Sequence, residues 1–135
     1  MGRADQRRRI VEQFNDCITG ADLAGLGALM TDDHRFVDSA GREWSGRDTC
    51  LETWAGFFDA FPGYRNVLAA VDSTGDVVVV TGRSECVEPS LDGPAIWTAT
   101  VAGDRVAEWR VYDDTAEMRA ALGVPPSERP PFKGG

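Results

Sequence analysis

Apolar residues recur at helical spacing in the first part of the chain. Ile10, Phe14, Cys17 and Ile18 fall on one face of a helix, and charged residues stand between them, which is the pattern of a helix with one buried side. A second, shorter apolar segment follows Asp22, whose carboxylate is placed to cap a helix. The two segments predict an N-terminal helical hairpin.

The pattern changes after the hairpin. Residues alternate in polarity between His34 and Asp38, and Gly41 supplies a turn, which predicts a short strand and a loop. From Ser45 onward, apolar and aromatic side chains return at three- and four-residue steps until Pro62 ends them. This third helix is predicted to be the most apolar helix of the chain.

Alternation with a period of two dominates the second half of the chain. It predicts strands near residues 64–72, 76–88, 94–102 and 105–113, each separated from the next by a turn that contains glycine. Strands that follow one another with short turns form an antiparallel meander.

A short helix and a tail complete the chain. Asp114 is placed to cap the helix and Gly123 to end it. Residues 124–135 are rich in proline and glycine and carry too little apolar area to fold alone, so we expect them to be flexible or to dock on a neighbour. We therefore assign one domain to residues 1–123 and a tail to residues 124–135.

Helices first and a curled antiparallel sheet second predict the α+β class. The concave face of such a sheet must be covered, and the aromatic third helix is the expected cover. The predicted architecture is a cone-shaped α+β barrel with one open end, in which a curved, mostly antiparallel sheet wraps around a long helix beside the N-terminal helical hairpin.

Charge and composition narrow the choice of partners. The 135 residues are 42% hydrophobic, enough for one core, and the net charge of −8 opposes binding to a phosphate backbone. We therefore expect no nucleic-acid partner. The first residues are charged and contain no long apolar stretch, which predicts no membrane span and a cytoplasmic location.

The residues available for chemistry are few. Cys17, Cys50 and Cys86 have no paired spacing and are predicted to be reduced thiols in apolar surroundings. With one histidine and no Cys-x-x-Cys motif, we expect no metal site. No phosphate loop or dinucleotide motif indicates a cofactor, so none is expected. Any catalysis therefore depends on carboxylates, one imidazole and tyrosines.

Strand alternation selects three candidate catalytic residues. His34 and Asp38 share a strand face with Phe36, and Asp113 continues the apolar row that holds Trp109, so all three are expected to face the interior. A buried carboxylate has a raised pKa that suits proton transfer, and an imidazole would orient it or take the proton. Each candidate also has a simpler interpretation. Asp38 would be a turn residue, His34 a structural or exposed histidine, and Asp113 a solvated aspartate at a strand end.

Aromatic side chains offer a candidate ligand site. Rings provide a large contact area for a flat apolar molecule at low entropic cost, and Tyr64 is able to donate a hydrogen bond to a ligand carbonyl. The simpler interpretation is that the rings only form the core. The residues predicted to contact a ligand are Phe14, Phe36, Trp44, Trp54, Phe58, Tyr64, Trp97, Trp109 and Val111.

Two segments resemble one known family. The stretch FVDSAGREWSG ahead of the third helix and the ending VAEWRVYDDTAEMRAALG, together with the order of the elements, resemble the SnoaL-like branch of the nuclear transport factor 2-like superfamily over nearly the whole chain. That branch is similar to ketosteroid isomerases, limonene-epoxide hydrolases and the aldol cyclases of polyketide pathways. These proteins share the cone but not the chemistry.

The resemblance implies roles for single positions. Asp38 falls where a ketosteroid isomerase keeps its general base. Phe14 stands where that family has a helix tyrosine, and Ile96 or Trp97 where it has a protonated aspartate. Val111 takes the place of a hydrolase carboxylate. The resemblance thus implies a base but not the usual oxyanion donors.

These observations leave three hypotheses. The first is a cofactor-independent isomerase, cyclase or hydrolase of an apolar carbonyl or polyketide-like substrate, with Asp38 as base assisted by Asp113 and His34. The second is a non-catalytic module that binds a small apolar ligand. The third is a structural dimer partner. The outer sheet face, with Ile96 and Tyr112, is mixed enough to pair with a second copy, so we expect a homodimer.

Overall fold

A computed structural model describes residues 2–126, so residues 127–135 of the predicted tail lie outside the described residues. The described chain forms helices and strands in an order that agrees with the α+β prediction. These elements are α1 (Arg3–Thr19), α2 (Leu23–Leu29), β1 (Met30–Val37), β2 (Glu43–Ser45), α3 (Arg47–Ala60), β3 (Arg65–Thr74), β4 (Val77–Glu85), η1 (Pro89–Leu91), β5 (Gly93–Ala102), β6 (Arg105–Asp113) and α4 (Ala116–Leu122).

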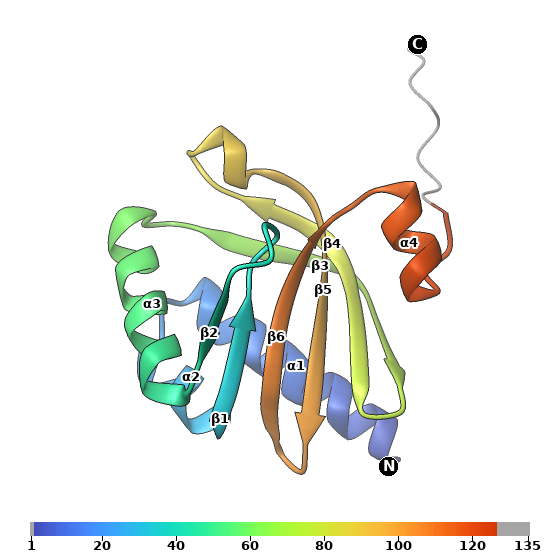
Figure 1. Cartoon of the computed structure of the whole chain (residues 1–135), viewed down its shortest axis with the longest axis horizontal. Helices are drawn as coiled ribbons and strands as arrows, with labels where there is room; N and C mark the ends of the chain where they lie inside the picture. Colours follow the sequence, from blue (N-terminus) through green and yellow to red (C-terminus); the bar gives the residue numbers. More distant parts are fainter. Residues whose placement is uncertain (1, 127–135) are drawn as a thin grey trace.

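The six strands form one curved sheet in the order β2-β1-β6-β5-β4-β3 (Figure 1). The meander from β3 to β6 is confirmed, and β6 has the predicted bounds. The first strand pairs antiparallel with β2 but parallel with β6. The sheet is therefore mostly antiparallel, as predicted, with one parallel pair that joins the early and late parts of the chain.

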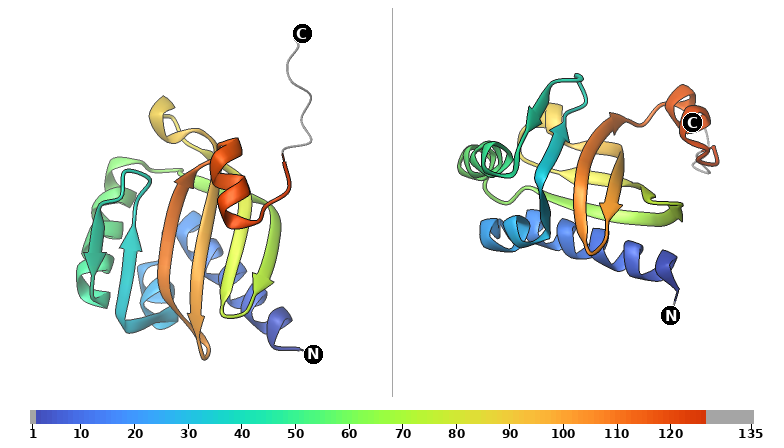
Figure 2. Two further views of the ribbon diagram at one scale, coloured as in Figure 1. Left: turned by 45° about the vertical axis from the view of Figure 1, so that its right-hand side comes forward. Right: turned by 60° about the horizontal axis from the view of Figure 1, so that its bottom comes forward.

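The helix that covers the concave face is α1. It runs across β3 to β6, as the right-hand view of Figure 2 shows, and it buries Ile10, Val11, Phe14 and Ile18 there. We expected the aromatic helix in this place, but α3 packs instead against β1, β2 and α2. The 17-residue α1 is long enough to cross four strands. No helix within residues 2–126 is long and apolar enough to cross a membrane.

The helix ends follow local chemistry, with two corrections. Asp22 caps α2 as predicted, because its Oδ1 accepts a hydrogen bond from the Gly25 N–H at 2.9 Å. Thr115, not Asp114, caps α4, since its hydroxyl accepts from the Met118 N–H at 3.0 Å. Gly46, not Ser45, precedes α3, where the backbone adopts a φ of 95° that favours glycine.

Irregular pairing shifts which residues face inward. A bulge lies between β5 and β6 at Thr100 and Val101, and it places Val106, rather than the expected Ala107, in the core. Beyond the bulge the predicted alternation holds, because Trp109 is fully buried and Val111 packs against the core. A second bulge, in β3, lies opposite Gly82 of β4.

The bulge in β3 predicts that Gly82 is required for its small size. A Cβ atom at Gly82 would overlap the Val67 carbonyl oxygen and lie 3.0 Å from the Leu68 Cα, and both of these are backbone atoms that cannot rotate away. We expect Gly82→Ala to lower the free energy of unfolding by about 2 kcal/mol or more, measured by urea denaturation.

Gly56 provides the matched control. It lies exposed in α3, and a Cβ atom there would meet nothing within 4 Å. Gly56→Ala should therefore raise stability by about 0.5–1 kcal/mol through helix propensity. Equal denaturation midpoints for Gly82→Ala and the natural protein would show that β3 does not hold this close approach in solution.

Candidate functional site in the cone interior

His34 is the polar side chain deepest in the interior. It is fully buried in β1, and its ring lies 5.7 Å from the Phe14 ring. The Nδ1 atom lies 2.7 Å from the main-chain carbonyl oxygen of Val106. A carbonyl oxygen only accepts, so Nδ1 carries the hydrogen and Nε2 presents a lone pair. Nε2 has no hydrogen-bond partner.

Burial keeps His34 neutral. Loss of hydration lowers the pKa of His34 below its ordinary value of 6.5, while the Val106 hydrogen bond and the carboxylates of Glu108 and Asp33 oppose this shift more weakly. A neutral imidazole with a free lone pair is a hydrogen-bond acceptor and a general base. The structure therefore places the one histidine of the chain in a chemically usable state.

Trp54 supplies the complementary group. Its indole ring is 5% exposed and packs among Phe36, Phe57 and Phe58. The indole Nε1–H donates to no acceptor, and among the described residues only this atom and His34 Nε2 are buried side-chain nitrogens or oxygens without a partner. Buried polar groups are normally paired, so these two nitrogens are the buried groups of the described interior that are open to a further hydrogen bond.

The residues predicted to contact a ligand do line this interior, where they pack against one another. Neighbouring ring centroids lie 4.8 to 6.4 Å apart, which are ordinary core distances. The rings thus form the core of the described structure. Phe14, Trp54, Trp97 and Trp109 are buried, and Phe36, Trp44, Phe58, Tyr64 and Val111 are partly buried against them.

Asp38 takes the simpler of its two predicted roles. The strand ends at Val37, and the Asp38 Oδ1 accepts hydrogen bonds from the Ala40 N–H at 3.0 Å and the Arg42 N–H at 2.9 Å. Its Oδ2 accepts from the Arg42 Nε at 2.9 Å. The run Asp-Ser-Ala-Gly is itself a turn signature, with aspartate first and glycine fourth. Both carboxylate oxygens are therefore used in holding the hairpin.

Asp113 lies far from His34. It pairs in register with the inward-facing Ala95, so it shares the interior face of the sheet, but its side chain is exposed at the end of β6. His34 contacts Val106, near the start of the same strand. The strand advances about 3.3 Å per residue, so the seven steps along β6 from Val106 to Asp113 put Asp113 roughly 20 Å from the end of the strand that His34 contacts. The three predicted catalytic residues therefore do not form one cluster.

A buried polar chain on the same interior face was not predicted, except for Tyr64. The Tyr64 hydroxyl lies 3.0 Å from the Ser84 Oγ, which lies 2.8 Å from the Asn66 Oδ1, and Asn66 in turn bonds to Asn15 of α1. Burial raises the pKa of Tyr64. The sequence does contain a signal, because Asn66 and Ser84 occupy inward positions of strands whose other inward residues are mostly apolar.

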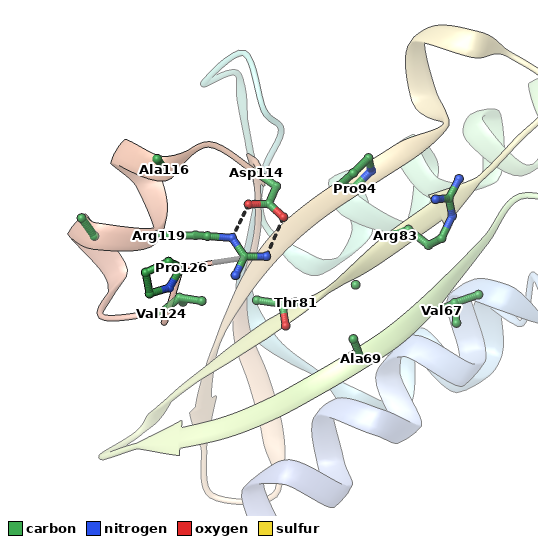
Figure 3. Close-up of a pocket in the computed structure, with 12 residues that line it drawn as sticks. Val67, Ala69, Thr81, Arg83, Pro94, Asp114, Ala116, Arg119, Val124 and Pro126 are labelled. Atoms are coloured by element: carbon green, nitrogen blue, oxygen red, sulfur yellow. Dashed lines mark hydrogen bonds and ion pairs between the residues drawn. The ribbon is translucent and has the colours of Figure 1, made fainter. Parts of the chain in front are cut away.

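A hollow of about 700 Å³ lies on the opposite face, between α4 and the outer side of β3 and β4 (Figure 3). Val67, Ala69 and Ala120 contribute apolar surface, and Arg119 bonds to both carboxylate oxygens of Asp114 at 2.6 and 2.8 Å. None of the predicted site residues lines this hollow. The candidate site therefore remains the interior around His34.

Asp38 gives a direct test of the turn assignment. Asp38→Ala removes the acceptor for two backbone N–H groups, so we expect a loss of about 1–2 kcal/mol in the free energy of unfolding. Asp38→Asn keeps the Oδ1 acceptor and should lose much less, because the ion pair it breaks is with the exposed Arg42. Chemical denaturation measures both values. An Asp38→Ala protein as stable as the natural one would restore the role of an unsatisfied functional carboxylate.

The lowered pKa of His34 predicts a pH dependence of stability. Below pH 6.5 the unfolded chain binds a proton at His34 that the folded chain does not, so the unfolded state is favoured as pH falls. Stability should be complete above pH 6.5 and decrease below it, and His34→Gln should flatten this part of the profile.

The ring signals of this single histidine give a second measurement by NMR. We expect the midpoint of their titration to lie below pH 6.5, because loss of hydration lowers the pKa of His34. Titration of the ring near pH 6.5 would show that His34 is hydrated and not a buried base.

Three solved structures show how widely this fold is used. An LEH-like epoxide hydrolase from M. tuberculosis aligns at 16% identity with a TM-score of 0.72 and covers 90% of this chain and 92% of its own. A structure from Jannaschia sp. CCS1 described as a SnoaL-like polyketide cyclase aligns at 24% identity with a TM-score of 0.70. The alignment covers 91% of this chain and 95% of that one. A structure from Kribbella flavida DSM 17836 described as a ketosteroid isomerase aligns at 15% identity with a TM-score of 0.67. The alignment covers 84% of this chain and 81% of that one.

At these identities the likeness shows the fold alone. No curated protein matches the chain. The SnoaL-like domain, however, matches residues 11–117, which run from α1 to α4 and include every strand of the sheet. The chain belongs to the SnoaL-like domain family.

Proposed function

We propose that this protein binds a small apolar organic molecule inside the cone and acts on it by cofactor-independent proton transfer, as an isomerase, cyclase or hydrolase of a carbonyl or polyketide-like compound. The observation that supports this most directly is the free lone pair of the buried, neutral His34. This assignment moves the role of base from Asp38, whose oxygens hold a turn, to His34.

The proposed step is proton abstraction next to a carbonyl group. The His34 Nε2 takes the proton, the electron pair of the C–H bond forms a carbon–carbon double bond, and the carbonyl oxygen gains the negative charge. Return of the proton from His34 to another carbon completes an isomerisation. The Trp54 N–H is the unpaired buried donor available to the charged oxygen. Trp54 thereby replaces the tyrosine and aspartate that the family resemblance lacks here.

The interior suits such a substrate for two reasons. Its walls are aromatic, and the rings of Phe36, Phe58 and Tyr64 are only partly buried. The names of two similar structures, a polyketide cyclase and a ketosteroid isomerase, refer to carbonyl compounds. Ligand entry requires these partly buried rings to move, because the rings contact one another in the described structure.

Hydrogen exchange tests the proposal without knowledge of the natural substrate. The enolisable ketone 2-tetralone is incubated with the protein in deuterium oxide, and loss of the α-proton signal is followed by NMR. We expect exchange above the buffer rate. His34→Gln should reduce the protein-dependent rate by about 100-fold or more.

Tyr112→Phe is the control for this experiment, because the Tyr112 hydroxyl bonds to Thr98 on the outer face of the sheet. It should leave the exchange rate unchanged. Exchange at the buffer rate with the natural protein, or an equal rate with His34→Gln, would contradict the catalytic proposal.

The second candidate is a non-catalytic ligand-binding or dimeric assembly module of the same fold. It is favoured by the distance between Asp113 and His34 and by the use of Asp38 in a turn. Under this function 2-tetralone binds without exchange. A homodimer through the outer face of the sheet also remains a proposal. A cytoplasmic location remains an expectation.

A further inference from the structure

We infer that the hollow between α4 and the outer side of β3 and β4 is a second binding site, and that its ligand is an aromatic carboxylate. The hollow measures about 700 Å³, which lies within the usual range of small-molecule sites. It is separated from the interior by the sheet, because α1 and His34 lie on the opposite face. The inference therefore does not depend on the proposed function.

The wall that α4 contributes is fixed by one arginine. Arg119 binds both carboxylate oxygens of Asp114, which precedes the helix, and its Nη1 donates to the Pro125 carbonyl oxygen at 2.8 Å, beyond the helix. The side chains of Arg119 and Asp114 are only 16% and 13% exposed, and a partly buried bidentate pair holds its geometry better than an exposed ion pair. These bonds fix α4 relative to the end of β6, so the hollow exists without a ligand.

The surface of the hollow is mainly apolar. Val67 and Ala69 line it from β3, and Ala120 lines it from α4 (Figure 3). Val67 is 41% exposed, and within residues 2–126 only Val87 is a large apolar side chain with greater exposure. Apolar surface left in water favours the binding of an apolar molecule that covers it. The body of the ligand is therefore expected to be a hydrocarbon ring system.

Arg83 supplies a charge at one end of the hollow. Its Nη2 lies 3.4 Å from Asp92 and its Nε lies 3.9 Å from Glu85. Charge-assisted hydrogen bonds are normally about 2.7–2.9 Å long, so both ion pairs are loose, and neither acidic residue lines the hollow. The one carboxylate that does line it, that of Asp114, is neutralised by Arg119. Arg83 is therefore able to form a closer pair with the carboxylate of a ligand.

Thr81 provides the second polar contact. It lies two residues before Arg83 in β4, so both side chains project from the same face of the strand. The Thr81 hydroxyl makes no hydrogen bond within the part of the chain that the structure describes, and a hydroxyl is able to donate its hydrogen to a carboxylate oxygen. The planar Arg119 guanidinium offers a surface on which an aromatic ring stacks. An acid group on a flat ring matches all three residues.

Two matched probes test the inference by calorimetric titration of the full chain. 2-Naphthoate carries the carboxylate, whereas 2-naphthamide has the same ring system and a similar shape without the charge. We expect the natural protein to bind 2-naphthoate at least about tenfold more tightly, because only the acid forms a charge-assisted pair with Arg83.

Two arginine variants distinguish this pair from general attraction to positive charge. Arg83→Gln should abolish the preference for 2-naphthoate. Arg65→Gln is the matched control, because Arg65 lies on the neighbouring strand and pairs with the same Glu85 at 2.7 Å but does not line the hollow. It should leave both affinities unchanged.

Ala120→Trp tests the location of the site. Ala120 is exposed on α4, so an indole ring at this position should fill part of the hollow and weaken both probes at least about tenfold. Any exchange of 2-tetralone should persist in this variant, because the interior lies on the other face of the sheet. If Arg83→Gln fails to fold, Ala120→Trp and the two affinities of the natural protein still decide the matter.

Four results would overturn the inference. These are equal affinities for the two probes, no binding of 2-naphthoate at millimolar concentration, an unchanged preference in Arg83→Gln, and unchanged affinities in Ala120→Trp. Light scattering adds a fifth. A natural protein that is dimeric and binds no probe, beside an Ala120→Trp protein that is monomeric, would show that a second copy of the chain occupies the hollow instead.

Discussion

The packing of α1 against the concave face of the sheet is the interaction on which the other features depend. A curved sheet exposes a large apolar face that is stable only when covered, and α1 covers it with one row of side chains that includes Phe14. The Phe14 ring contacts both His34 and Trp109. The cover of the core is thus also the floor of the candidate site, and a change in α1 affects stability and chemistry together.

The same helix carries the polar element that crosses the apolar layer. Asn15 joins α1 to β3 through Asn66, next to a fully buried apolar row. A satisfied amide pair of this kind fixes the position of a helix along its axis more sharply than apolar contacts do, because each bond has one allowed geometry. Because the Asn66 Oδ1 accepts the hydrogen of the Ser84 hydroxyl, the Tyr64 hydroxyl donates its own hydrogen to Ser84. Position and hydrogen-bond direction in the cone therefore have one origin.

Local patterns in the sequence predicted most of the fold but little of the site. Alternation predicted β6 with its observed bounds, and Asp22 marked the start of α2, because these features depend on neighbouring residues. Whether α1 or α3 covers the sheet depends on the length of each helix compared with the width of the sheet. The sequence does not show the shape of that sheet. For Asp38, resemblance suggested a base, while the local Asp-Ser-Ala-Gly turn signature indicated the observed hairpin. The partners of Asn66 lie on other elements, so alternation alone does not reveal them.

The parallel pairing of β1 with β6 has a consequence for how the chain reaches this structure. The two strands come from opposite ends of the domain, and the His34 hydrogen bond to Val106 spans 72 residues. Contacts this distant in sequence form slowly, because a long loop must close before they contribute. During synthesis, β1 and the helices before it are made first, but β1 cannot pair with β6 until β6 has left the ribosome. Until then the apolar face of α1 has no complete surface to cover, so the nascent chain exposes apolar surface until β6 pairs with β1.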